Sequence, residues 1–351
     1  MIHQLSFFRS SGIPDRPRRG TLPTLVGLVG LLALGFAGVQ VWWLFTSPPA
    51  LRDGSRIVEI PPRLGLVEVT ERLEAAGVIR SPMAFMGLAI LRGTARTLKA
   101  GEYEIPRGAN SVTVLALLEG GKVLRHPVLL REGGTLGELA RAIEAEKLAR
   151  VADTLRVARD PFFLRTIDVR ADSVEGYLFP DTYQFVKGMT PEEMLARMVS
   201  RMREQVTAQI LEEARTRDIS LHQVLTLASI IEREAADPKE MPLISAVFWN
   251  RLKRDMPLQA DPTVAYALGK EGRSLTRGDL ETDSPFNTYR RTGLPPGPIG
   301  SPGRAAIEAA VRPADVEYLY FVALDGRRHQ FSRSLAEHNQ AVARFRLVRP
   351  R

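Results

Sequence analysis

The 351-residue chain contains no cysteine, which excludes disulfide frameworks, thiolate metal sites and cysteine nucleophiles. Its five histidines are scattered, with no H-x-x-x-H spacing, so we expect neither a metal site nor a cofactor. The motifs G-x-x-x-x-G-K-[ST] and G-x-S-x-G are also missing. Their absence excludes P-loop nucleotide binding and a nucleophile-elbow serine.

The chain is basic, with a net charge of +8, but no aromatic-basic motif of the known RNA or DNA modules occurs in it. We therefore expect no nucleic-acid partner. Hydrophobic residues make up 44% of the sequence, which is typical of a globular protein, and the length suffices for two domains with separate cores.

Residues 22–46 form a run of 25 residues without a charge. As a helix the run would be about 37 Å long, and the hydrocarbon core of a bilayer is about 30 Å thick. A cleaved signal peptide is the alternative, but the following WWLFTSPPALRDG offers no small-residue cleavage site. We predict a single transmembrane helix. Four arginines against one aspartate in residues 1–21 keep this tail in the cytoplasm by the positive-inside rule, so all that follows residue 46 is extracytoplasmic.

After a Pro/Gly linker at 47–55, three stretches share one layout: a strand-like segment, a Gly or Pro turn and a short amphipathic helix. They span residues 57–79, 103–123 and 127–148, and the first two share the letters EIP. We interpret residues 56–125 as an α+β module whose strand-helix-helix-strand layout resembles the LysM glycan-binding fold, and residues 126–160 as a connecting strand-helix unit. A repetitive scaffold without a ligand is the alternative interpretation.

From residue 161 to residue 347 the segments are longer. A helical region covers about 190–236, the loop-rich GLPPGPIGSPG covers 293–303, and a strand-like segment and a helix follow at 318–324 and 334–346. The fold class predicted for the whole chain is α+β: a transmembrane helix, a LysM-like module and a mixed α+β domain.

A glutamate interrupts an apolar helix face in LASIIEREA (227–235). Ser220 and Gln223 are spaced as a capping box, which predicts the start of this helix. Glu232 lies four residues after Ala228 and points with the apolar side chains. Three interpretations are open for such a carboxylate. The helix face stops being buried at this residue, the carboxylate pairs with a buried cation, or it is desolvated. Desolvation and the negative end of the helix dipole both raise the pKa of a glutamate, which can then protonate a leaving oxygen.

The motifs around this helix resemble those of the endolytic murein transglycosylase family. They are LASIIEREA, VFWNRLKRDMPLQADPTVAYALG (247–269), SPFNTYRRTGLPPGPIGSPG (284–303), YLYFVALDGRRHQFSRSLAEHN (318–339) and EGYLFPDTYQF (175–185). The resemblance implies that Glu232 is the catalytic acid of residues 161–347. It also implies cleavage of the MurNAc-GlcNAc bond inside nascent peptidoglycan strands, with 1,6-anhydro ends. The bacterial inner membrane would be the location, and penicillin-binding synthases are the expected partners.

The other motifs supply candidate groove residues. Gln259, Asp261 and Thr263 offer hydrogen bonds to sugar hydroxyl or acetamido groups, or form an Asx-type turn without a ligand. Asn287, Thr288 and Tyr289 offer amide-type bonds and a ring for stacking. We list Glu175 and Asp181 with these substrate-binding candidates, although helix capping and aromatic packing explain both nearly as well.

The sequence is also compatible with two other functions. A non-catalytic, membrane-anchored protein could bind or scaffold peptidoglycan through the LysM-like module. An ordinary hydrolase would cut the same bond with water and leave reducing ends.

Overall fold

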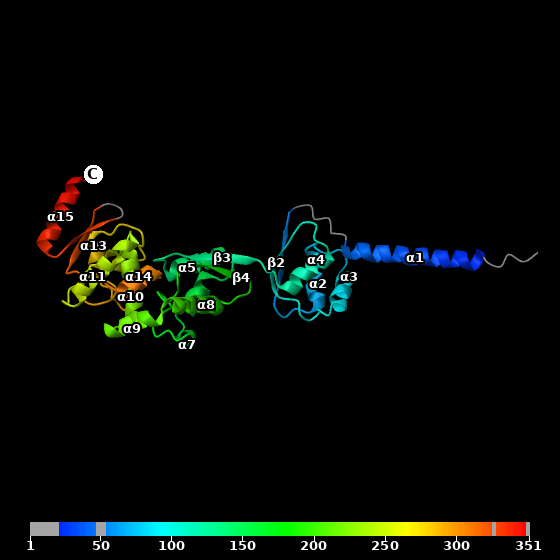
Figure 1. Ribbon diagram of the computed structural model, residues 1–351, viewed down its shortest axis with the longest axis horizontal. Coiled ribbons are helices and arrows are strands. Elements are labelled where there is room, and N and C mark those ends of the chain that lie inside the picture. The colour runs from blue at the N-terminus through cyan, green and yellow to red at the C-terminus, as the bar shows by residue number, and fades with distance from the viewer. Residues whose placement is uncertain (1–20, 47–53, 325–327, 349–351) are drawn as a thin grey trace, which may run out of the picture. The chain divides into compact units, whose positions relative to one another are not determined.

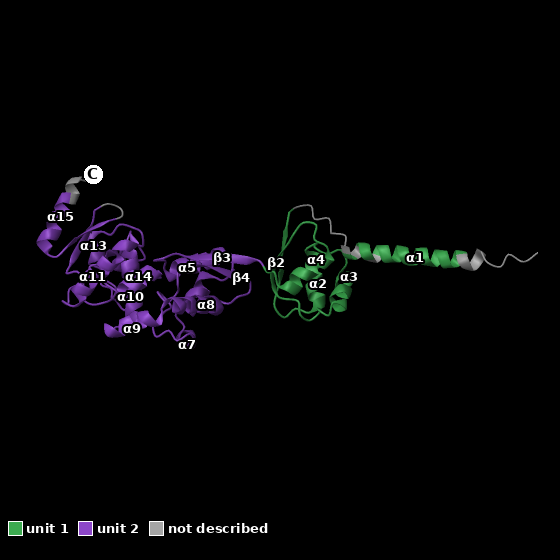
Figure 2. Cartoon of the chain, viewed as in Figure 1, with its two compact units in different colours: residues 1–123 green, residues 124–351 purple. Residues whose placement is uncertain are grey.

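The computed structural model describes residues 21–46, 54–324 and 328–348. The chain divides into two compact units, residues 1–123 and 124–351 (Figure 2). The predicted cytoplasmic tail, apart from residue 21, and most of the predicted linker at 47–55 lie outside the described residues.

The first unit contains a small antiparallel sheet covered by helices (Figure 1). Val58 and Ile60 on β1 and Tyr103 and Ile105 on β2 point inward, as the two-residue period of a strand requires. Its elements are α1 (Thr21–Thr46), β1 (Arg56–Ile60), α2 (Leu66–Ala75), α3 (Pro82–Leu91), β2 (Gly101–Ile105) and α4 (Ser111–Gly120). In the part of the chain that the structure describes, no helix meets the length and apolarity needed to cross a membrane.

The second unit is mainly helical, with two further strand pairs. Strand β3 pairs antiparallel with β4, so that Leu130 lies opposite Asp181. Its elements are β3 (Arg125–Leu130), α5 (Leu136–Ala145), α6 (Val151–Val157), α7 (Pro161–Thr166), β4 (Asp181–Val186), α8 (Pro191–Gln205), α9 (Ala208–Thr216), α10 (Leu221–Glu234), η1 (Pro238–Glu240), α11 (Met241–Leu252), α12 (Asp261–Leu268), α13 (Arg277–Leu280), α14 (Arg304–Val311), β5 (Tyr320–Ala323), β6 (His329–Ser332) and α15 (Leu335–Val348).

The three similar stretches each form a strand followed by a helix: β1 with α2, β2 with α4, and β3 with α5. The first two share the core of unit 1. The third packs elsewhere, because Val128 and Leu139 belong to the same core as Phe185 and Met198. Residues 126–160 therefore lie within unit 2. The coarse prediction of mixed α and β structure is confirmed.

Helix α10 begins where the capping box predicts, since the Ser220 hydroxyl accepts a hydrogen bond from the Gln223 N–H and the Gln223 side chain bonds back to the Ser220 N–H. The face opposite the apolar stripe is also buried: Thr226 is 1% and Ser229 0% exposed. Their hydroxyls donate to backbone carbonyls one turn earlier in the helix, and the Ser229 hydroxyl also accepts the Ile299 N–H. These bonds satisfy polar groups that burial would otherwise leave unpaired.

Candidate functional site

Glu232 lies in the last turn of α10 and is partly buried. Its Oε2 atom accepts a hydrogen bond of 2.8 Å from the Gly303 N–H, at the start of α14. The carboxylate therefore receives a backbone donor at a helix N-terminus, where partial positive charge favours an anion.

Two loops meet at this carboxylate. Gly133 donates its N–H to the Ser301 carbonyl at 2.8 Å, and Ser301 donates its own to the Gly134 carbonyl at 2.9 Å. A side chain at Gly300 would place a Cβ atom 2.6 Å from the Gly133 carbonyl oxygen. The backbones of the two loops can approach this closely only because residue 300 is a glycine. The loop GLPPGPIGSPG (293–303) thus borders Glu232.

The pKa of Glu232 is raised, first by burial and then by the nearby negative charge of Glu132, while the Gly303 N–H acts in the opposite direction. The protonated form is favoured by desolvation, and the ionised form retains a donor. Glu132 follows β3 in the REGGT loop and lies against Gly303. Sequence reasoning missed it, because an exposed glutamate after a strand carries no local signal of its tertiary neighbour.

Several predicted groove residues gather in a second cluster beside Glu234, which is also on α10. The Tyr289 hydroxyl donates to Asp261 at 2.5 Å, and Gln259 accepts a hydrogen bond from Arg251 at 3.1 Å. These residues line a pocket of about 300 Å³ together with Glu234. The acid of α10 that lines this pocket is Glu234; Glu232 is not among its lining residues.

The remaining groove candidates have internal partners. The hydroxyls of Thr263 and Thr288 bond each other at 2.8 Å, and both residues are buried. Asn287 donates to the carbonyls of Leu280 and Thr282. These three side chains hold the loop that carries Tyr289. Because their hydrogen bonds go to other groups of the protein, we interpret them as structural support for Tyr289.

The YceG-like family model matches residues 58–344 of the chain. The chain belongs to this family. Among its relatives, the endolytic murein transglycosylase of Bacillus subtilis is 33% identical over 303 residues, covering 82% of this chain and 84% of that protein. The Streptococcus pneumoniae protein of the same name is 31% identical, covering 91% of this chain but only 64% of that longer protein.

A crystal structure of a putative YceG-like protein from Listeria monocytogenes is also similar. It is 35% identical in sequence, covers 82% of this chain and 98% of that one, and superposes with a TM-score of 0.59. The family resemblance stated from the motifs is therefore confirmed.

Glu175, in this YceG-like chain, is a buried structural acid. Its carboxylate accepts the Leu136 N–H at the start of α5, at 3.0 Å, and the Tyr266 hydroxyl at 3.3 Å. Burial raises the pKa of Glu175 to about 7, and these hydrogen bonds oppose the shift. Asp181 is exposed and pairs with Arg201 at 3.2 Å. Capping and pairing account for both residues.

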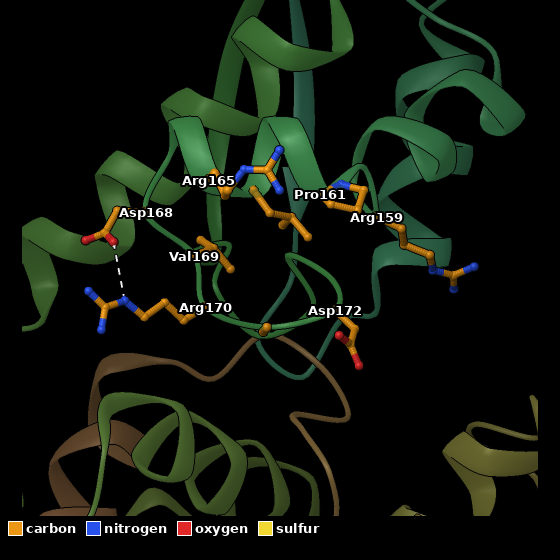
Figure 3. Close-up of a pocket in the computed structure, with 9 residues that line it drawn as sticks. Arg159, Pro161, Arg165, Asp168, Val169, Arg170 and Asp172 are labelled. Carbon is orange, nitrogen blue, oxygen red and sulfur yellow. Dashed lines mark ion pairs between the residues drawn. The ribbon is translucent and has the colours of Figure 1, made fainter.

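A larger hollow of about 460 Å³ lies between α7 and the loop that follows it (Figure 3). Its charged lining residues include Arg165 and Arg170, and Arg170 faces Asp168 across 3.8 Å (Figure 3). None of the site residues named above, Glu232 included, lines it. Among the residues that the structure describes, no group of histidine, aspartate and glutamate side chains is arranged to hold a metal ion.

Proposed function

We propose that this YceG-like protein is an endolytic lytic transglycosylase that cuts peptidoglycan strands, with Glu232 as its acid and base. The observation that carries the proposal is the environment of Glu232, which favours a proton through burial and Glu132 yet keeps one backbone donor for the carboxylate. The curated relatives carry the name endolytic murein transglycosylase. A non-catalytic scaffold would have no need for this balance.

Glu232 would act twice in one cycle. First it protonates the glycosidic oxygen, so that the bond between that oxygen and C1 of the muramyl residue breaks. The resulting carboxylate then takes the proton from the muramyl 6-hydroxyl as its oxygen bonds to C1. The ring closes as a 1,6-anhydro end, no water is consumed, and Glu232 is protonated again. Because the attack is intramolecular, a second protein carboxylate is not needed as a nucleophile.

The proposal places the protein on the outer face of a bacterial inner membrane, beside the synthases that extend glycan strands. The uncharged run at 22–46 supports a single membrane span. Its apolar side chains point outward: Leu34 is 73% and Trp42 70% exposed. Such a surface suits lipid rather than water. The β1-α2-α3-β2 layout supports a LysM-like, glycan-binding role for residues 56–125.

The chemistry of the new ends tests the proposed function. We expect the purified full-length protein in detergent to convert un-crosslinked glycan strands to fragments with anhydro ends. By mass spectrometry each such end is one water lighter than a hydrolytic end. Reducing ends would identify a hydrolase, and uncut strands that still bind the protein would identify a scaffold.

Replacing Glu132 with glutamine should shift the pH profile of cleavage. The charge of Glu132 helps to raise the pKa of Glu232, so its removal lowers that pKa. The protonated, active form is then lost at lower pH, and the alkaline limb of kcat/KM moves to lower pH. Glu192→Gln, an exposed glutamate on α8, is the control and should leave the limb in place. An unchanged limb in Glu132→Gln would argue against Glu232 as the titrating acid.

A further inference from the structure

The 300 Å³ pocket beside Glu234 has no role in the proton transfers of Glu232. It lies between the end of α10, helix α11, the start of α12, strand β5 and helix α15. The titratable and charged groups that face it are Glu234, Arg251, Asp261, Tyr289, Tyr320 and His338.

Two polar groups of the pocket have no protein partner within the described part of the chain. The Glu234 carboxyl makes no hydrogen bond to another described residue. The Nδ1 atom of His338 is buried and also unpaired. Glu234 is half-buried and lines the pocket, so a ligand in the pocket can reach its carboxyl group and supply the missing hydrogen-bond partner.

The other walls of the pocket are fixed in place. The Arg251 guanidinium lies 5.2 Å from the Tyr320 ring centre, and the His338 ring stacks on Tyr320 at 5.4 Å. Arg251 also donates to the carbonyls of Leu319 and Leu258. The wall is therefore preorganised, and binding costs little side-chain ordering.

We propose that this pocket binds one uncharged N-acetylated sugar unit of the glycan strand, with Glu234 donating a hydrogen bond to it as a neutral acid. The inference rests on the proposed function and extends it by a substrate-positioning residue. Carboxyl, phenol and imidazole groups match the hydroxyl and acetamido groups of such a sugar, and the aromatic rings match its apolar face. The volume lies at the lower end of the range for small-ligand sites.

The protonation state of Glu234 disfavours the ammonium group of a stem peptide. Burial, and then the nearby charge of Asp261, raise the pKa of Glu234 to about 8. Near neutral pH the group is protonated and donates. As pH rises through about 8 it ionises, a carboxylate cannot donate, and the sugar is held less well. The ammonium group of a peptide would instead bind better to the ionised form.

Steady-state cleavage by the full-length protein tests this site. Below pH 7.5 we expect Glu234→Ala to raise KM roughly tenfold while kcat stays within about threefold, and Glu234→Gln, which still donates, to keep KM near the wild-type value. An N-acetylglucosamine tetramer should inhibit competitively, with a Ki about tenfold higher for Glu234→Ala only. Above pH 8 the wild-type KM should rise, whereas that of Glu234→Gln should not.

The outcomes separate this site from the proposed function. If the wild type forms no anhydro ends, the proposed function fails before any variant is compared. If the wild type is active but Glu234→Ala keeps its KM and Ki, the pocket assignment is wrong. A Glu234→Gln variant as inactive as Glu232→Gln would make Glu234 a proton-transfer group, and stronger inhibition by a stem tripeptide than by the tetramer would make the ligand a peptide. Trp249 fluorescence melting checks that each variant is folded.

Discussion

Glutamine in place of Glu232 should lower the rate of strand cleavage by roughly 10³-fold or more, because one positioned acid or base contributes about 10² to 10⁴ and Glu232 serves in both steps. The amide oxygen can still accept the Gly303 N–H, which Glu232 accepts at 2.8 Å, so the fold around the site should persist. What the variant loses is the exchangeable proton. We expect kcat to fall while the affinity for strands changes little.

The measurement is the yield of anhydro-ended fragments per unit time from un-crosslinked strands. Glu192→Gln is the matched surface control, and it should cleave at the wild-type rate. If Glu232→Gln releases anhydro ends as fast as the wild type, the catalytic role belongs to another residue. If neither the wild type nor Glu232→Gln releases anhydro ends, yet both bind strands, the result supports a non-catalytic scaffold.

Acid-base behaviour of Glu175 should make the stability of the second unit depend on pH. The pKa of its buried carboxyl is raised from 4.5 to about 7, so folding favours the neutral form. This contribution is fully present below about pH 4.5 and is lost as pH rises through about 7. At about 1.4 kcal/mol per pKa unit, the loss amounts to about 3 kcal/mol.

Glu175→Gln should remove this part of the pH dependence. Glutamine carries no titrating proton, and its amide oxygen can still accept the Leu136 N–H. Urea unfolding followed through Trp249, the tryptophan of the second unit, gives the unfolding free energy at each pH. Between pH 4 and pH 8 it should fall by about 3 kcal/mol less in the variant than in the wild type. Equal slopes would show that Glu175 is ionised in the folded protein.

Local patterns were sufficient for the features that depend on neighbours along the chain. The capping box at Ser220 predicted the start of α10, because an N-cap bond joins residues three apart. The strand-helix layout of three stretches followed from hydrophobic periodicity and turn residues. The family was evident from ordered motifs, which the match over residues 58–344 confirms.

Local sequence patterns could not predict contacts between segments that are distant along the chain. The approach of Glu132 to Glu232 depends on two loops that are about a hundred and seventy residues apart and meet through hydrogen bonds between Gly133 and Ser301. Thr226 and Ser229 lie opposite the apolar stripe of α10, yet both are buried, because other segments cover α10 on that side as well.

The amino-acid sequence alone was sufficient to infer the family, the mixed fold and Glu232 as the candidate catalytic acid. Each of these inferences depends on short-range spacing or on motif identity. The tertiary structure determines the environment of each acid. Glu232 contacts Gly303, Glu175 accepts a hydrogen bond at the start of α5, and Glu234 lines a pocket with Asp261. The reason is physical. A carboxyl's proton affinity is set by the burial, charges and donors around it in space, and most of these belong to segments far away along the chain.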